Sequence, residues 1–179
     1  MFSYDDVKIR KFEEKDIPLK VKWINDPNIN TYLHYDLPLT IEGTTKWFER
    51  IKDRNDRFDG TVEYNGVPVG ICGLLNIDHR NKRAEIYFTI GDQSFQHRGI
   101  CTKGFHILFD YAFNDLGLNK ITGLVEAINV PSLGLVKKFN FKHEGTLVED
   151  VKQGDVFIDR HCFAYFAKDY FKDYESSKK

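Results

Sequence analysis

Gln96-His97-Arg98-Gly99-Ile100-Cys101-Thr102 is the most informative segment of the chain, because it joins a strand pattern to a helix pattern. Before it, residues 83–91 alternate apolar and polar side chains, as a half-buried strand does. After it, apolar residues recur at the three- and four-residue spacing of an amphipathic helix: Phe105, Phe109, Ala112, Phe113 and Leu116. The segment is therefore predicted to lead from a strand into the first turn of a helix.

The first turn of a helix leaves N–H groups unpaired and carries a partial positive charge, so a phosphate can bind there. Gly99 allows the backbone to turn and to approach a ligand closely, because it has no Cβ. An ordinary strand-to-helix turn has the same pattern. One glycine does not separate the two interpretations.

Length and composition restrict the class of protein. With 179 residues, 41% hydrophobic and 15% aromatic, the chain is expected to form one globular domain over residues 1–179 that needs no disulfide or metal. The net charge of -1 and the absence of a basic run argue against a nucleic-acid partner and against a membrane surface. Partners must therefore be inferred from local sites.

The sequence pattern also predicts a location. Residues 1–6 lack the basic leader and apolar stretch of a signal peptide, and no apolar run is long enough to span a bilayer. Three distant cysteines and six scattered histidines show no metal-ligand spacing. We expect a cytoplasmic, reduced protein without a metal.

The other elements predict one mixed α/β domain. A frayed polar tail is expected at 174–179. Asn65-Gly66 is a strong hairpin signal, because both turn residues need positive φ. The predicted strands are 7–12, 61–64, 67–76, 83–91, 120–127, 141–151 and 156–166, and the predicted helices are 14–24, 40–51, the one after Gly99, and 132–139.

This order of elements, with Gln96 and Gly99 in the turn, resembles the GNAT superfamily of acetyl-CoA-dependent N-acetyltransferases. The family pattern for the pyrophosphate loop is Q/R-x-x-G-x-G/A, and Cys101 stands where Gly or Ala is usual. Residues 129–141, NVPSLGLVKKFNF, resemble N-x-x-S-x-x-L-Y-E-K-x-G-F of the RimJ/RimL-type branch. Asn140 replaces a glycine there, which is acceptable because Asn tolerates the left-handed conformation.

The resemblance implies an α/β (α+β) fold with a single GNAT-like domain. Its central sheet would be mixed, mostly antiparallel and of about seven strands, with a splayed central pair and about four flanking helices. The splay would separate strands 83–91 and 120–127, and acetyl-CoA, the cosubstrate, would enter the gap.

The same resemblance implies where acetyl-CoA binds. The pantetheine arm would take backbone hydrogen bonds from strand 83–91 as an added strand does, and the pyrophosphate would lie on N–H groups of 97–102. Asn129 and Ser132 match positions near the pantetheine and the thioester, although a simple helix cap is an equal alternative. The predicted cofactor-binding residues are Thr89, Ile90, Gly91, Gln96, His97, Arg98, Gly99, Ile100, Cys101, Thr102 and Asn129.

Acetyl transfer to an amine needs a base, because a protonated amine cannot attack a thioester. Glu85 is the first candidate, since strand alternation puts it on the same face as Tyr87 and Thr89. A solvated or ion-paired glutamate is the alternative interpretation. The weaker candidates for the base are Glu126, Asp78 and His79.

The position that usually supplies the general acid differs from the family pattern. Many members use a tyrosine where Val136 stands, to protonate the leaving thiolate, and valine has no proton to give. Ser132, a water molecule or no acid at all would then serve. Glu85 and Ser132 are therefore the predicted catalytic residues, while Cys101 is interpreted as a structural replacement.

The acceptor site of the family lies in residues 23–47, where Trp23, Tyr32, Tyr35 and Trp47 either stack on a sugar or base or belong to the core. Segments 22–27, 46–48 and 73–78 look most like the branch that acetylates amino-sugar nucleotides. The prediction is direct acetylation of a small primary amine of that class in a ternary complex. The alternatives are a polyamine (spermidine-type) acetyltransferase, a protein N-terminal acetyltransferase or a non-catalytic acyl-CoA-binding module; a homodimer is compatible with each.

Overall fold

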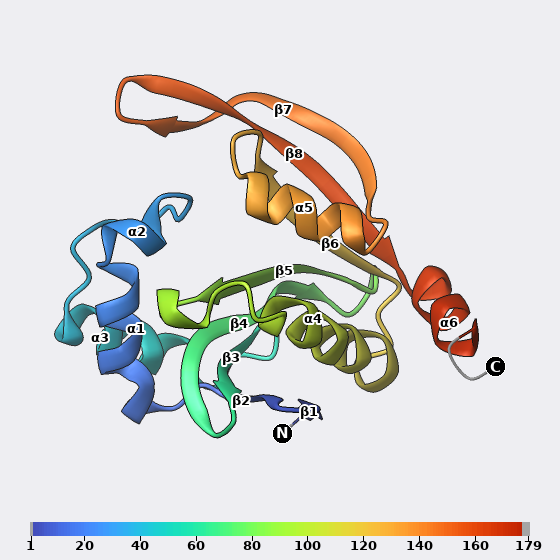
Figure 1. Ribbon diagram of the computed structural model, residues 1–179, viewed down its shortest axis with the longest axis horizontal. Coiled ribbons are helices and arrows are strands. Elements are labelled where there is room, and N and C mark those ends of the chain that lie inside the picture. Colours follow the sequence, from blue (N-terminus) through green and yellow to red (C-terminus); the bar gives the residue numbers. More distant parts are fainter. Residues whose placement is uncertain (1, 177–179) are drawn as a thin grey trace.

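One eight-stranded sheet organises the chain (Figure 1). The computed structural model describes residues 2–176, and the strand order is β1-β2-β3-β4-β5-β6-β8-β7. The strands are β1 Phe2–Tyr4, β2 Val7–Lys11, β3 Phe58–Tyr64, β4 Val67–Asp78, β5 Arg83–Ile90, β6 Lys120–Glu126, β7 Lys142–Gln153 and β8 Val156–Phe166. The helices are α1 Ile17–Ile24, α2 Pro27–Asn30, α3 Ile41–Ile51, α4 Ile100–Asp110, α5 Val130–Lys138 and α6 Ala167–Ser176, with a π-helical turn at Tyr111–Asp115 and 3₁₀ turns at Glu14–Asp16 and Gln93–Phe95.

The central pair of strands is splayed, as predicted. β5 and β6 run parallel and pair only at Arg83 with Lys120, Ala84 with Ile121 and Glu85 with Thr122. Beyond Glu85, β5 continues to pair with β4, and β6 continues to pair with β8. Residues 86–90 and 123–126 therefore diverge and leave backbone groups on the facing strand edges.

The expected fold class is confirmed, with local differences. The turn residues Asn65 and Gly66 have φ of 49° and 80°, and Asn140 has φ of 53°, as their sequence positions required. β3 begins at Phe58, three residues before the predicted start of the strand at 61, and Asp59 in this added part is buried against Arg57.

Two terminal elements and one short helix were not predicted. β1 is only three residues long, and α2 is a single turn that begins at Pro27, after the predicted helix 14–24. α6 includes residues 174–176 of the expected frayed tail, and 177–179 lie outside the described residues. Tyr170 holds α6 to the domain through a ring contact with Phe113, whose ring centroid is 5.4 Å away.

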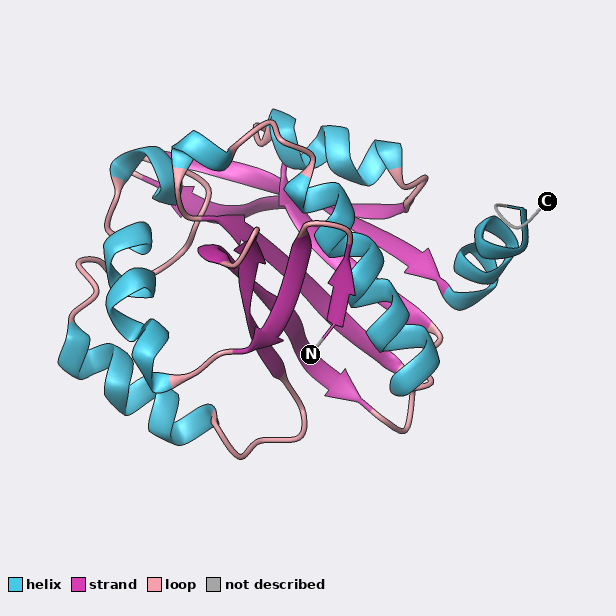
Figure 2. Cartoon of the chain, turned by 60° about the horizontal axis from the view of Figure 1, so that its bottom comes forward, coloured by secondary structure: helices cyan, strands magenta, loops and turns pink. Residues whose placement is uncertain are grey.

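Helices cover the two faces of the sheet in separate groups (Figure 2). The long α4 packs against β1, β2 and β5, while α1 packs against α3 and β4. Strand alternation divides β5 between two hydrophobic clusters: Ile86 and Phe88 pack with α4, and Tyr87 packs with α1 and α3. Gly104 of α4 lets the helix approach closely, since a Cβ there would lie 2.2 Å from the Phe88 ring.

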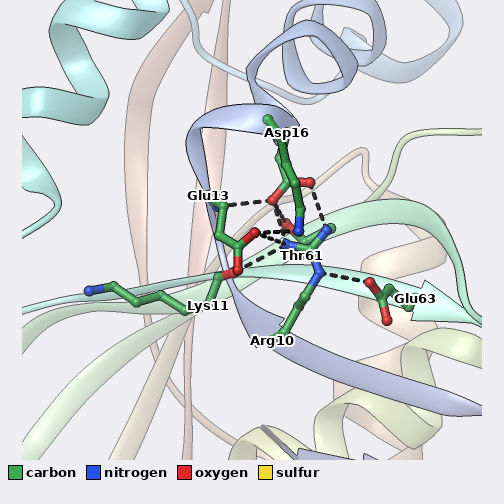
Figure 3. A network of polar contacts seen from close by, with 7 residues as sticks. Arg10, Lys11, Glu13, Asp16, Thr61 and Glu63 are labelled. Atoms are coloured by element: carbon green, nitrogen blue, oxygen red, sulfur yellow. Dashed lines mark hydrogen bonds and ion pairs between the residues drawn. The ribbon is translucent and has the colours of Figure 1, made fainter.

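A buried ion pair fixes the start of α1 to the sheet (Figure 3). The Arg10 guanidinium on β2 donates two hydrogen bonds to Asp16, of 2.6 and 2.7 Å, and one of 2.7 Å to Glu63 on β3. Asp16 also accepts hydrogen bonds from the Glu13 amide and the Thr61 hydroxyl. This network positions the helix that carries part of the site described next.

Candidate active site

A cavity of about 910 Å³ occupies the region where β5 and β6 diverge. Its walls come from β5, the turn after it, the start of α4, β6, α5 and the segment before α3. Most of the predicted site residues line this cleft: Glu85, Thr89, Ile90, Gln96, His97, Gly99, Ile100, Cys101, Thr102, Asn129 and Ser132.

Two predicted cofactor residues lie outside that lining. The Gly91 N–H donates to the Val69 carbonyl at 2.8 Å, and a Cβ on Gly91 would lie 2.2 Å from the Trp23 ring. Gly91 therefore serves the packing of α1. The Arg98 side chain is exposed and its Nε donates to the Ser94 carbonyl at 3.0 Å.

The predicted phosphate turn has the backbone shape of an anion cradle. His97 and Gly99 have φ of 61° and 76°, and Gly99 precedes the first residue of α4. No side chain caps this helix start within the part of the chain that the structure describes. The amides of Ile100, Cys101 and Thr102 therefore stand at the wall of the cleft without a capping side chain. We call this part of the cleft, formed by 96–102, the cofactor end.

Cys101 is a thiol rather than a nucleophilic thiolate. Burial raises its pKa to about 11 and outweighs the opposite effect of the helix backbone. The thiol therefore stays protonated at neutral pH, which favours the interpretation of Cys101 as a small structural replacement.

Glu85 stands at the apex of the splay, in the last residue pair before β5 and β6 separate. Its side chain is half-buried and lines the cleft together with Tyr87 and Thr89, which the predicted alternation placed on the same face. One weak contact restrains it, from the Asn76 amide at 3.5 Å. Its carboxylate is thus available to a molecule in the cleft.

Tyr87, next to Glu85 on this face, is engaged in a closed network. Its hydroxyl donates to Asp59 at 2.8 Å, and Arg57 binds both oxygens of Asp59, at 2.5 and 2.7 Å. Burial raises the Tyr87 pKa well above its usual value, and the Asp59 charge adds to this. The network leaves Glu85 as the carboxylate of the lining without a strong partner.

The weaker candidates for the base lie elsewhere. Asp78 accepts two hydrogen bonds from Asn81 and orders the β4–β5 turn. His79 lines a separate cavity of about 440 Å³ and contacts the Asn55 carbonyl at 3.3 Å.

Glu126 forms a pair with a residue that the sequence reasoning missed. Its Oε1 lies 2.5 Å from Nε2 of His34, while its Oε2 is buried and has no partner among the described residues. The Glu126 side chain is 3% exposed, and the His34 imidazole reaches the cleft. No sequence signal links residues 92 positions apart.

Asn129 acts as the cap that one interpretation proposed. Its side-chain oxygen accepts from the Ser132 amide at 3.1 Å at the start of α5. Both residues also line the cleft, so capping does not remove them from it. Val136 is buried and lines the same cleft, which leaves an apolar surface where a tyrosine is usual in the family.

The opposite end of the cleft carries aromatic side chains and one lysine. Of the four candidate aromatics, Trp23 is a core residue, while Tyr32, Tyr35 and Trp47 line the cleft. Lys20 of α1 also lines it, with Nζ 3.3 Å from the Trp47 ring centroid. Sequence reasoning missed Lys20, because it occurs in an ordinary amphipathic helix. We call this region, formed by Lys20, Tyr32, Tyr35 and Trp47, the acceptor end.

Among the side chains of residues 2–172, no group of three His, Cys, Asp or Glu is placed to hold a metal ion. Over residues 2–176, no helix has the length and apolar character needed to cross a membrane.

A splayed parallel pair with an uncapped helix start beside it is the arrangement that the sequence resemblance to the GNAT acetyltransferases predicted. A family model, described as acetyltransferase (GNAT) domain, matches residues 6–142. The chain therefore belongs to the GNAT acetyltransferases, and it is an N-acetyltransferase with acetyl-CoA as cosubstrate.

Relatives agree with this assignment. Uncharacterized N-acetyltransferase p20 of Bacillus licheniformis is 28% identical over 167 residues, which are 90% of this chain and 93% of that protein. Spermidine N(1)-acetyltransferase of Escherichia coli K12 is 27% identical over 152 residues, 84% of this chain and 80% of that protein.

Solved structures show the same fold. Spermidine N-acetyltransferase from Vibrio cholerae, in complex with CoA and spermine, superposes with a TM-score of 0.88 at 21% identity, covering 94% of this chain and 99% of that one. A dodecameric structure of spermidine N-acetyltransferase from the same organism superposes with a TM-score of 0.83 at 20% identity, covering 95% and 99%.

Proposed function

We propose that this enzyme acetylates the primary amine of an amino-sugar nucleotide, by direct attack within a ternary complex. The observation that carries the proposal is the chemistry of the acceptor end, where Tyr32, Tyr35 and Trp47 line the cleft and Lys20 adds a positive charge. Aromatic faces suit a sugar or a base, and a positive charge suits a phosphate.

Glu85 is the proposed base. From the apex of the splay it takes the proton of the bound ammonium group, directly or through a water molecule. The amine nitrogen then forms a bond to the thioester carbonyl carbon, the C–S bond breaks, CoA leaves as a thiolate, and the nitrogen releases its second proton as the neutral amide forms. A free thiol has a pKa of about 8.5, so a thiolate leaves without much help, and Ser132 or water can return the proton.

The cofactor end is proposed to hold acetyl-CoA. The backbone of Thr89 and Ile90 faces the gap that β6 leaves open, where the pantetheine arm can add to the strand edge. The amides of residues 97–102 would bind the pyrophosphate. Asn129, at the N-terminus of α5, lines the same cleft. The Gly91 N–H is already used by Val69, so we assign no cofactor contact to that donor.

A polyamine is the second candidate acceptor, because a spermidine N(1)-acetyltransferase is 27% identical over 84% of this chain and another spermidine N-acetyltransferase has the same fold. The charges of the cleft oppose it. Among the lining residues that the structure describes, the carboxylates are Asp59 and Glu85, and Asp59 is neutralised by Arg57. Lys20 would repel a second ammonium group of a polyamine.

A thiol-release assay with acetyl-CoA decides between these acceptors. The panel comprises amino-sugar nucleotides, free amino sugars, spermidine and N-terminal peptides, with CoA binding measured in parallel by calorimetry. We expect the highest kcat/KM for an amino-sugar nucleotide. Higher kcat/KM for spermidine would overturn the proposed acceptor, and CoA binding without turnover for any amine would favour the non-catalytic module.

We further propose that two chains pair through the β7–β8 hairpin, which extends beyond the body of the domain (Figure 1). This hairpin exposes Leu147, Val148, Val156 and Phe157, at fractions from 41% to 74%. Sedimentation should give a dimer for the natural chain and a monomer for Val148→Lys/Phe157→Lys. Val67→Lys, at an exposed apolar residue of β4, is the control, and a natural chain that sediments as a monomer would refute the pairing.

A further inference from the structure

Lys20 occupies a core-facing position of α1. The buried residues of this helix are Ile17, Lys20, Trp23 and Ile24, a stripe in which an apolar side chain is the usual choice. Lys20 is 5% exposed, and its Nζ is surrounded by rings: the centroids of Trp47, Tyr35 and Phe12 lie at 3.3, 5.7 and 5.8 Å.

No carboxylate among the side chains that the structure describes forms an ion pair with this ammonium group. The lining carboxylate whose charge acts on Lys20 is Asp59, and its two oxygens are already bound by Arg57 and Tyr87. Nζ makes no hydrogen bond to any group of residues 2–172. Its donors therefore remain available on the side of the cleft, where Lys20 is part of the lining.

Burial of a charge without an ion-pair partner is costly, so the position calls for an explanation. Burial lowers the Lys20 pKa to about 8, which still leaves most of the population charged at neutral pH. The cation–π interaction with Trp47 offsets part of the free-energy cost of burying the charge. An apolar side chain would pack against the same ring without any such cost, so packing alone does not account for a lysine here.

We propose that Lys20 is the anion receptor of the acceptor end, and that it binds a phosphate or carboxylate group of the amine that is acetylated. This rests on the proposed function, and it narrows the acceptor to amines that also carry a negative charge. The ammonium of the acceptor would lie toward Glu85 and its anionic group toward Lys20, so the two ends of the molecule are recognised by opposite charges. A polyamine cannot satisfy the second contact.

Binding of amine-free sugars to the CoA-loaded protein tests the receptor without turnover. Calorimetry compares glucose with glucose 6-phosphate, glucuronate and UDP-glucose, which separate a monophosphate, a carboxylate and a diphosphate on related frames. The natural chain should bind at least one anionic probe about tenfold or more tightly than glucose. Equal affinity for glucose and all three anionic probes would overturn the proposal, whatever the behaviour of any variant.

Lys20→Met removes the charge and keeps a flexible side chain that packs on Trp47. It should abolish the preference for the anionic probe, while Lys20→Arg retains it at least in part. Lys22→Met is the matched control, because Lys22 lies on the same helix but is exposed and outside the cleft lining. An unchanged preference in a folded Lys20→Met protein, checked by its thermal unfolding, would also overturn the proposal.

Turnover separates this inference from the proposed function. If Lys20 is the receptor, Lys20→Met should raise KM for glucosamine 6-phosphate or another anionic amine much more than it changes kcat. If an anionic sugar binds in a way that depends on Lys20 but no amine is acetylated, the role of Lys20 as anion receptor is supported and the proposed reaction is refuted. If the natural chain and Lys20→Met acetylate amino-sugar nucleotides at equal rates, the role of Lys20 as anion receptor is refuted and the proposed reaction is supported.

Discussion

Gly99 combines positive φ with open space around its Cα, since a Cβ there would meet nothing within 4 Å. Gly99→Asp should weaken CoA binding by about tenfold or more, because it adds a negative charge where the pyrophosphate is expected. Gly99→Asn has nearly the same shape and tolerates the left-handed conformation, so it should retain most of the affinity. Calorimetry with CoA measures both, and equal losses in the two variants would point to shape rather than charge.

Glu85 is the residue on which the proposed chemistry depends. Glu85→Gln should lower kcat by about a hundredfold or more while leaving CoA affinity nearly intact, since the amide cannot accept the proton. The loss should shrink at high pH, where more of the amine is already neutral. Wild-type turnover by Glu85→Gln with a confirmed acceptor would move the base to His34 and its partner Glu126.

Single residues were predictable where a local pattern determines them. Alternation along one strand placed Glu85 with Tyr87 and Thr89, and positive φ was predictable at Asn65 and Gly66. Lys20 and the His34–Glu126 pair were not predictable, because their meaning depends on neighbours far away in sequence. For Gly91, the sequence does not reveal that Trp23 packs on its Cα.

The contact of α1 with the sheet depends on Asp16, whose folded-state pKa lies below its usual value. Burial alone would raise this pKa, but hydrogen bonds from Arg10, the Glu13 amide and Thr61 together outweigh burial. A depressed folded pKa adds stability above the unfolded pKa near 3.9, and this stability is lost as pH falls through the folded pKa.

Asp16→Asn should therefore lower the free energy of unfolding at pH 7 by about 2–4 kcal/mol, because the buried Arg10 charge loses its two hydrogen bonds to the Asp16 carboxylate and keeps only Glu63 and the more distant Glu13. Urea unfolding at pH 7, 5 and 3 measures this, and the difference from the natural chain should narrow toward pH 3. Asp155→Asn, at an exposed carboxylate, is the control. A difference that stays constant with pH would contradict the ionic origin.

The distance between α4 and β5 depends on Gly104. Gly104→Ala should destabilise the protein by about 1–3 kcal/mol, because its Cβ would overlap the Phe88 ring. Gly134→Ala in α5 should instead stabilise it by about 0.5–1 kcal/mol, since no atom lies within 4 Å of the added Cβ and Ala favours helix. Thermal unfolding compares the pair, and equal signs would contradict the close approach of α4.

Elements with strong periodicity were predicted with small shifts at their ends, such as α5 and β5. Elements whose existence depends on contacts made elsewhere were missed. β1 is too short to show a period and forms by pairing with β2, while α6 is held by Tyr170 against Phe113. Such elements follow from tertiary structure more than from local preference.

At the scale of the whole molecule, three residue pairs join β5 to β6, and the cleft separates the two strands beyond them. CoA that binds in the cleft should stabilise the fold by about 2.7 kcal/mol at a hundredfold excess over its Kd. Hydrogen exchange should then slow most at 86–90 and 123–126. A rise in melting temperature with uniform protection, or with none at these edges, would place the ligand elsewhere.

The same junction has a consequence for how the chain is assembled during synthesis. β1 to β5 follow each other in the sheet in the order of the sequence, so each strand can join its predecessor as it leaves the ribosome. β6, β7 and β8 form a second unit, which follows α4 in the sequence and must join β5 through the parallel β5–β6 pairing. We therefore expect the cleft to form late, when the two nearly complete units meet. The chain should then bind acetyl-CoA only after all of its strands have been synthesised.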